Sequence, residues 1–208
     1  MAVKDIAEAV VVMDEAKVVD LVKAEIAAKT DVDEILNAGL IDAMDIVGQK
    51  FSDGSLFVPE MLMAAKAMKA GLEELKPYLS AGAAVSRGTV IIGTVKGDLH
   101  DIGKNLVALM MEGAGMDVVD LGVDIDAEKF VEAAIEHNAG VVALSALLTT
   151  TMPTMQTIVA AIKEAGIAAK TIIGGAPVTA AFADQIGADG FSADAPGAVE
   201  LTRKLLTA

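Results

Sequence analysis

TVIIGTVKGDLHDIGKN, residues 89–105, is the stretch that decides the fold class of this 208-residue chain. Its first seven residues are mostly apolar and β-branched, which is typical of a strand buried on both faces of a parallel sheet. A polar loop follows, and a helical pattern begins near residue 102. The stretch therefore predicts a strand, a loop and a helix, which is the repeating unit of an α/β domain.

The same alternation continues to the C-terminus. Further strand-like runs lie at 117–121, 141–145 and 171–174, with a weaker one at 189–192. Helical stretches occupy about 102–115, 126–138, 153–165, 177–186 and 196–206. These lengths predict right-handed crossovers and a flavodoxin-like (Rossmann-type) α/β domain with a five-stranded parallel sheet. In such a domain a ligand lies beyond the carboxyl ends of the strands.

The N-terminal part of the chain has a helical period instead. Apolar residues recur there at steps of three and four, as at Ile35, Leu36, Leu40, Ile41, Met44, Ile46 and Val47. Thr30 or Asp31 can cap a helix start, and Pro59 suits the first turn of another helix. The predicted organisation is a four-helix bundle cap over 1–80, a linker of small residues over 81–88 and the α/β domain over 89–208.

Composition excludes several classes of protein. The formal charge is −14, with 16 basic against 30 acidic residues, which argues against a nucleic-acid partner. The chain has no cysteine, so disulfides, thiolate metal sites and a cysteine nucleophile are excluded. It shows neither a signal-peptide pattern nor an apolar run of membrane-spanning length. We therefore expect a cytoplasmic protein without a membrane partner.

The loop after the first predicted strand carries His100. A neutral imidazole is a good transition-metal ligand, and a carboxylate such as Asp98 can orient it through its other nitrogen. Gly97 and Gly103 allow a tight turn and the close approach of a bulky ligand. The only other histidine, His137, lies near a predicted helix end and is explained by the helix dipole. A single imidazole fits a macrocyclic metal, whose ring supplies four ligands, better than a conventional metal site.

The sequence resembles the cobalamin-binding domains of methionine synthase and of the corrinoid proteins of methylotrophic methyltransferase systems. Their signature is Asp-x-His-x-x-Gly, Ser-x-Leu and Gly-Gly at set spacings. Here it matches DLHDIG at 98–103, SAL at 145–147 and GG at 174–175, separated by the 41 positions 104–144 and the 26 positions 148–173. The N-terminal half also resembles the helical cap of this family, so the resemblance covers nearly the whole chain.

The resemblance implies a base-off, histidine-on cobalamin of the methylcobalamin type, in which His100 is the lower axial ligand of cobalt. Asp98 would accept a hydrogen bond from the other imidazole nitrogen. Thr151 stands where methionine synthase has the serine that completes this relay. The other cofactor contacts implied in the His100 loop are Gly97, Leu99, Asp101, Ile102 and Gly103. Asp101 can also be read as a helix N-cap, and Lys104 as a phosphate contact.

The resemblance also implies a slot for the nucleotide tail that His100 displaces. Ser145 would contact the nitrogen of the tail, and Leu147 and Thr149 would line the slot. Gly174 and Gly175 would leave room for the tail, and Ala195 would close its pocket.

In the cap, the resemblance places Phe51 and Val58 over the upper ligand of cobalt. The chain departs from methionine synthase at two cap positions. Methionine synthase has leucine where Val58 stands and glutamate where Asn37 stands.

The function implied by the resemblance is methyl transfer by a carrier that is not a complete enzyme alone. A substrate-specific methyltransferase would load the methyl group, and an acceptor methyltransferase would pass it to coenzyme M or tetrahydrofolate. A reductive activase is the third implied partner. Three alternatives are a cobalamin-dependent sensor without its own DNA-binding module, the small subunit of a carbon-skeleton mutase, and a flavodoxin-like domain without corrinoid. Methanol, methylamines, quaternary amines, methylthiols and aryl methyl ethers are all candidate donors.

Overall fold

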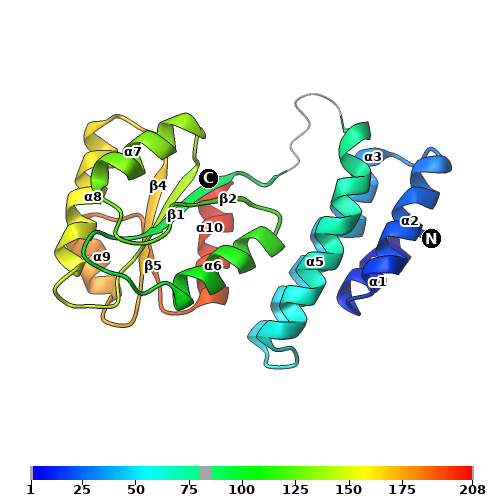
Figure 1. The fold of residues 1–208 in the computed structure, drawn as a ribbon, viewed down its shortest axis with the longest axis horizontal. Coiled ribbons are helices and arrows are strands. Elements are labelled where there is room, and N and C mark those ends of the chain that lie inside the picture. The colour runs from blue at the N-terminus through cyan, green and yellow to red at the C-terminus, as the bar shows by residue number, and fades with distance from the viewer. Residues whose placement is uncertain (1, 80–85, 208) are drawn as a thin grey trace. The chain divides into compact units, whose positions relative to one another are not determined.

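The computed structural model describes residues 2–79 and 86–207, which form two compact units (Figure 1). The helices of the first unit are α1 (Ala2–Val11), α2 (Glu15–Ala27), α3 (Val32–Glu34), the π-helix η1 (Ile35–Ile41), α4 (Asp42–Ser52), α5 (Val58–Leu75) and the 3-10 helix η2 (Lys76–Tyr78). Because α3, η1 and α4 follow one another without a break, they make one long helix. The described part of this unit therefore has the four main helices that its periodicity predicts.

The π-helix η1 was not predicted, and it explains how the third long helix packs. Five of its seven residues are buried, namely Ile35, Leu36, Gly39, Leu40 and Ile41. A π-helix has i→i+5 hydrogen bonds, which place an additional residue in the turn and widen the buried face. Of the apolar positions predicted between 35 and 47, only Ile46 is exposed, at 44%.

Two of the predicted helix starts are seen in atomic detail. The Asp31 carboxylate accepts a hydrogen bond from the Glu34 N–H at 3.0 Å, so Asp31 rather than Thr30 is the cap of α3. Pro59 lies in the first turn of α5, where a missing N–H costs nothing.

The second unit is a parallel α/β sandwich. Its strands are β1 (Thr89–Thr94), β2 (Asp117–Asp120), β3 (Val141–Ser145), β4 (Lys170–Gly174) and β5 (Gly190–Ser192). Its helices are α6 (Ile102–Gly113), α7 (Ala127–Glu136), α8 (Met152–Glu164), α9 (Ala180–Ile186) and α10 (Ala195–Leu206). All strand pairs are parallel, in the order β2-β1-β3-β4-β5. This is the flavodoxin-like order, so the predicted fold class is confirmed.

Helices cover both faces of this sheet (Figure 1). On one face, Phe130 of α7 and Met155 and Ile158 of α8 form a buried core with Val142 and Leu144 of β3. The helices α6 and α10 lie on the other face. Because side chains alternate along a strand, Ala143 and Ser145 of β3 point toward α6 and α10 instead.

The predicted linker at 81–88 lies mainly outside the described residues, of which 86–88 lead into β1. Among the helices that the structure describes, none combines the length and the apolar character needed to span a membrane.

Asp189, just before β5, gives the domain a pH-dependent contact with β4. Its carboxylate accepts hydrogen bonds from the backbone N–H (2.8 Å) and the hydroxyl (3.1 Å) of the buried Thr171, and lies 3.4 Å from Lys170 Nζ. Burial by itself raises the pKa of Asp189, but the bonds from Thr171 and the charge of Lys170 outweigh it and lower the pKa below the ordinary 3.8.

A carboxyl group whose pKa is lowered by folding stabilises the protein while it is ionised. This stabilisation should be complete above pH 3.8 and should be lost as the pH falls through the lower pKa of the folded state. We expect Asp189→Ala to lower the free energy of unfolding at pH 7 by about 1–2 kcal/mol, because Thr171 loses its acceptor. Urea unfolding at pH 7 and pH 3 tests this, and an equal loss at both values would contradict it.

Candidate functional site

Three motifs meet at the carboxyl edge of the sheet. The loop after β1 carries His100, the loop after β3 carries Leu147, and the turn after β4 carries Gly174 and Gly175. All of these residues line one pocket together with Ser145. The register of the sheet explains this, because parallel strands end at the same edge.

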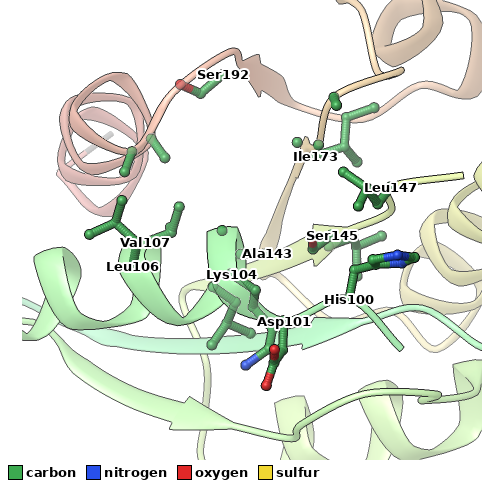
Figure 2. A pocket seen from close by; sticks show the side chains of 18 of the residues that line it. His100, Asp101, Lys104, Leu106, Val107, Ala143, Ser145, Leu147, Ile173 and Ser192 are labelled. Carbon is green, nitrogen blue, oxygen red and sulfur yellow. The ribbon is translucent and has the colours of Figure 1, made fainter. Parts of the chain in front are cut away.

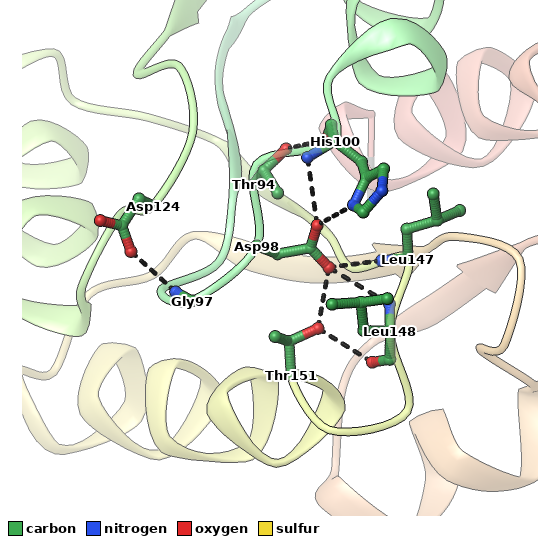
Figure 3. A network of polar contacts seen from close by, with 8 residues as sticks. All are labelled: Thr94, Gly97, Asp98, His100, Asp124, Leu147, Leu148 and Thr151. Carbon is green, nitrogen blue, oxygen red and sulfur yellow. Dashed lines mark hydrogen bonds and ion pairs between the residues drawn. The ribbon is translucent and has the colours of Figure 1, made fainter.

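Asp98 is the centre of a hydrogen-bond network behind His100 (Figure 3). Its Oδ1 lies 2.7 Å from His100 Nδ1 and accepts the His100 N–H at 3.1 Å. Its Oδ2 accepts the N–H groups of Leu147 (2.7 Å) and Leu148 (3.2 Å), and the Thr151 hydroxyl at 2.8 Å. The side chain of Asp98 is fully buried. The carboxylate thus joins the loop after β1 to the loop after β3.

The network keeps Asp98 ionised. Burial by itself raises the pKa of this carboxyl, but hydrogen bonds from Leu147 N–H, the His100 ring, the Thr151 hydroxyl and His100 N–H outweigh it and hold the pKa well below its usual range. An ionised carboxylate can only accept hydrogen bonds, so His100 Nδ1 must be the donor. In a neutral imidazole this leaves Nε2 with its lone pair.

His100 itself is half exposed, at 51% of its side chain, while Asp98 behind it is buried. The arrangement presents one imidazole nitrogen outward and fixes the other, which is how proteins orient a metal-binding histidine. Thr151 is buried as well, and its hydroxyl also lies 2.9 Å from Leu148 O. A hydroxyl has one proton, and the bond to the charged Asp98 is the stronger of the two.

A pocket of about 640 Å³ extends from His100 between the sheet and the helices α6 and α10 (Figure 2). Several of the residues facing it from β3, β4 and α10 are small, namely Ala143, Ser145, Gly174, Ala195 and Ala198, while Ile172 and Ile173 of β4 add larger apolar side chains. Leucine or isoleucine at these positions would fill the space. The pocket thus fits a long, mostly apolar group that enters beside His100.

The structure brings most of the predicted site residues together. Those lining the pocket are Leu99, His100, Asp101, Ile102, Gly103, Ser145, Leu147, Gly174, Gly175 and Ala195. Gly97 and Asp98 lie in the same loop, behind the histidine. Thr149 is exposed in the turn before α8 and is not among the described pocket residues. Phe51 and Val58 are partly buried in the helical unit, at the end of α4 and the start of α5.

The structure shows that position 175 requires glycine for a reason other than the predicted room for the nucleotide tail. Its φ is +127°, and a Cβ at this position would lie 1.9 Å from Ala146 O. The chain itself therefore requires a glycine here, whatever the pocket contains. At Gly174 a Cβ would meet Ser192 O at 3.2 Å, which is tight but less severe.

Sequence reasoning missed the role of Lys104. Its ammonium group is buried, bonds to Asp120 Oδ2 (2.5 Å) and Asn105 Oδ1 (2.6 Å), and so joins α6 to the end of β2. The small residues Ala143 and Ala198 were missed too. Spacing could have identified both. Ala143 is two residues before Ser145 on the same strand, and Ala198 is three residues after Ala195 on the same helix, so each shares a face with a predicted pocket residue.

A larger side chain at Ala143 tests whether the pocket binds a ligand. We expect Ala143→Leu to weaken corrinoid binding by about tenfold or more, because overfilling a packed space costs about 1–3 kcal/mol. Ala160→Leu, on the exposed side of α8, is the matched control and should bind as the wild type does. Equal affinities in a titration followed by visible absorbance would show that the slot is not used.

Two sequence profiles match the chain. The profile of a B12 binding domain matches residues 88–201, and a second profile with the same description matches residues 2–76. The matches fall on the α/β unit and on the helical unit.

Curated relatives and solved structures are similar over nearly the full length. Dimethylamine corrinoid protein 1 of Methanosarcina acetivorans is 46% identical over 179 residues, 85% of this chain and 84% of that protein. Trimethylamine corrinoid protein 1 of the same organism is 42% identical over 203 residues, 96% and 94% of the two chains. A chain in the crystal structure of the methanol:cobalamin methyltransferase complex from Methanosarcina barkeri aligns with TM-score 0.87 and 30% identity, covering 99% of this chain and 80% of that one. A cobalamin-binding protein from Desulfitobacterium hafniense aligns with TM-score 0.77 and 32% identity, covering 98% of each.

Proposed function

The chain belongs to the family of B12-binding corrinoid proteins, and from this premise we propose that His100 is the lower axial ligand of a base-off corrinoid. The protein carries a methyl group for a methyltransferase system. When bound, the corrinoid supplies a cobalt centre that can accept a methyl group and give it up. The residues of this chain hold that centre and set its environment.

The observation that carries the proposal is the 2.7 Å contact between Asp98 and His100 Nδ1. The contact supports a fixed imidazole that donates its Nδ1 proton to the ionised carboxylate, and Nε2 would then be free to bind cobalt. The carboxylate also increases the basicity of the ring, which strengthens it as a ligand. Thr151 and the two backbone N–H groups hold Asp98 from the other side.

The pocket between the sheet and the helices α6 and α10 supports the base-off form. If His100 takes the lower position on cobalt, the nucleotide tail of the corrinoid must lie elsewhere. The pocket begins beside His100, contains the Ser145 hydroxyl and is otherwise lined mainly by small and apolar residues. These features suit an aromatic base with one nitrogen that accepts a hydrogen bond.

For the methyl donor we propose a methylamine. The dimethylamine and trimethylamine corrinoid proteins are 40–46% identical to this chain, against 30% for the chain from the methanol system. The direct partner would then be a methylamine-specific methyltransferase. A second methyltransferase, acting on coenzyme M or tetrahydrofolate, and a reductive activase would complete the system.

The test is methyl transfer to the reconstituted, reduced full chain. Dimethylamine, trimethylamine and methanol are each supplied with the methyltransferase specific for that donor. We expect the visible spectrum to change to that of the methylated corrinoid with a methylamine and its enzyme. Methylation with methanol alone would overturn the donor assignment, and no methylation with any of the three would overturn the carrier function.

A further inference from the structure

The segment between β2 and α7, residues 121–126, runs beside the loop that carries His100. The Ile125 N–H donates to Thr94 O at 3.0 Å, and the Asp124 N–H donates to Asp98 O at 3.1 Å. The segment thus holds the end of β1 and the backbone of the residue that orients His100.

Asp124 adopts an unusual backbone conformation in this segment, with φ +59°. The other described non-glycine residues with positive φ are Met13, Lys29 and Asn138. Each of these three follows the end of a helix, where the left-handed conformation is an ordinary way to terminate it. Asp124 follows no helix, so its conformation needs a local reason. Aspartate is one of the few residues that tolerate this region.

The reason lies in a bond to Gly97 (Figure 3). The Asp98 N–H donates to Val95 O at 3.1 Å and closes a turn in which Gly97 is third, with φ +86°. This φ is what a type II turn requires at its third residue. The turn does not use the Gly97 N–H, and Asp124 Oδ1 accepts it at 2.7 Å. Asp124 therefore holds two adjacent residues of the turn, one through its side chain and one through its N–H.

We propose that Asp124 is a positioning residue for the corrinoid site, acting through the turn that places Asp98 and hence the His100 ring. The inference rests on the proposed ligation of cobalt by His100. The bond to Gly97 lies at an exposed edge, so water can satisfy this N–H if Asp124 is replaced. The backbone bond from residue 124 to Asp98 O and the Lys96–Asp126 ion pair (3.7 Å) remain after such a substitution. Water cannot replace the additional side-chain tie between Gly97 and residues 121–126, and that tie is what the proposal assigns to Asp124.

Two substitutions separate the effect of the hydrogen bond to Gly97 from the effect of the Asp124 charge. Asp124→Gly and Asp124→Asn both remove the charge, and both residues tolerate positive φ. Only asparagine keeps an oxygen that can accept the Gly97 N–H. Because glycine is relaxed at this φ, we expect both variants to unfold at urea concentrations close to that of the wild type.

In the corrinoid-free full chain, we expect the amides of Gly97 and His100 to exchange hydrogen several-fold faster in Asp124→Gly than in Asp124→Asn. In the cobalamin-loaded chain, Asp124→Gly should bind about three- to tenfold more weakly, less than the roughly 10- to 100-fold that direct partners of metal ligands contribute, because Asp124 acts one step further out. It should also show a smaller histidine-nitrogen signal in the cobalt(II) electron paramagnetic resonance spectrum. Asp124→Asn should resemble the wild type in all three measurements.

Equal exchange and equal affinity in the two variants would overturn the inference and leave the proposed function standing, provided that the wild type shows the histidine-nitrogen signal. If the wild type lacks that signal, the proposed ligation fails, and the positioning role fails with it. The wild-type spectrum therefore distinguishes the two failures.

Discussion

Replacing His100 with alanine should remove the histidine-nitrogen splitting from the electron paramagnetic resonance spectrum of the cobalt(II)-loaded protein. The splitting requires a nitrogen bonded to cobalt from below, and within His100 the contact of Nδ1 with Asp98 leaves Nε2 for that bond. Labelling histidine with ¹⁵N distinguishes this splitting from one caused by the nitrogen of the nucleotide tail. The visible spectrum should change at the same time to that of a corrinoid without a lower nitrogen ligand. We expect a complete loss of the signal rather than a partial one, because His137, the other histidine of the chain, is not among the described residues that line the pocket.

Retention of corrinoid by His100→Ala is compatible with this expectation, because the pocket beside His100 offers contacts of its own. His137→Ala is the matched control, since His137 is the other histidine of the chain and is exposed at the end of α7. It should keep the wild-type spectrum. An unchanged spectrum in His100→Ala would rule out ligation by this residue.

The periodicity of the sequence was sufficient to predict the fold class. Long β-branched runs separated by helical stretches have few other solutions, and right-handed crossovers reduce the possible strand orders to a few. The π-helix η1 could not be predicted in this way. Its residues Ile35, Leu36, Leu40 and Ile41 are apolar at ordinary helical spacing, and only packing against the neighbouring helices decides that Gly39 and Ile41 are buried together.

Part of the candidate site could also be predicted from the sequence, but for a different reason. His100 and Asp98 are two residues apart, so one loop brings them together, and their chemistry is visible in the sequence. The Asp98 contacts with Leu147 and Leu148 use backbone N–H groups, which every residue but proline has and which no motif reveals. Asp124 was missed similarly, because the role proposed for it depends on a backbone angle and on a contact 27 positions away.

Gly175→Ala should destabilise the corrinoid-free protein strongly, by roughly 4 kcal/mol or more. The added Cβ would lie 1.9 Å from Ala146 O and 2.8 Å from its carbonyl carbon, and backbone atoms cannot move aside as the end of a side chain can. The φ of +127° is also strained for any residue with a Cβ. Gly174→Ala should cost less, since its Cβ would lie 3.2 Å from Ser192 O.

Urea unfolding of the corrinoid-free chain distinguishes two explanations for Gly175. In the first, the contact with Ala146 requires a glycine; in the second, both glycines serve only to admit the nucleotide tail. If the second explanation holds, Gly175→Ala should be as stable as the wild type and should fail only in binding corrinoid. Gly48→Ala in α4 is the control, because a Cβ there meets no atom within 4 Å and alanine is up to about 1 kcal/mol better than glycine inside a helix. A stable, corrinoid-free Gly175→Ala protein would show that the ligand, and not the contact with Ala146, requires this glycine.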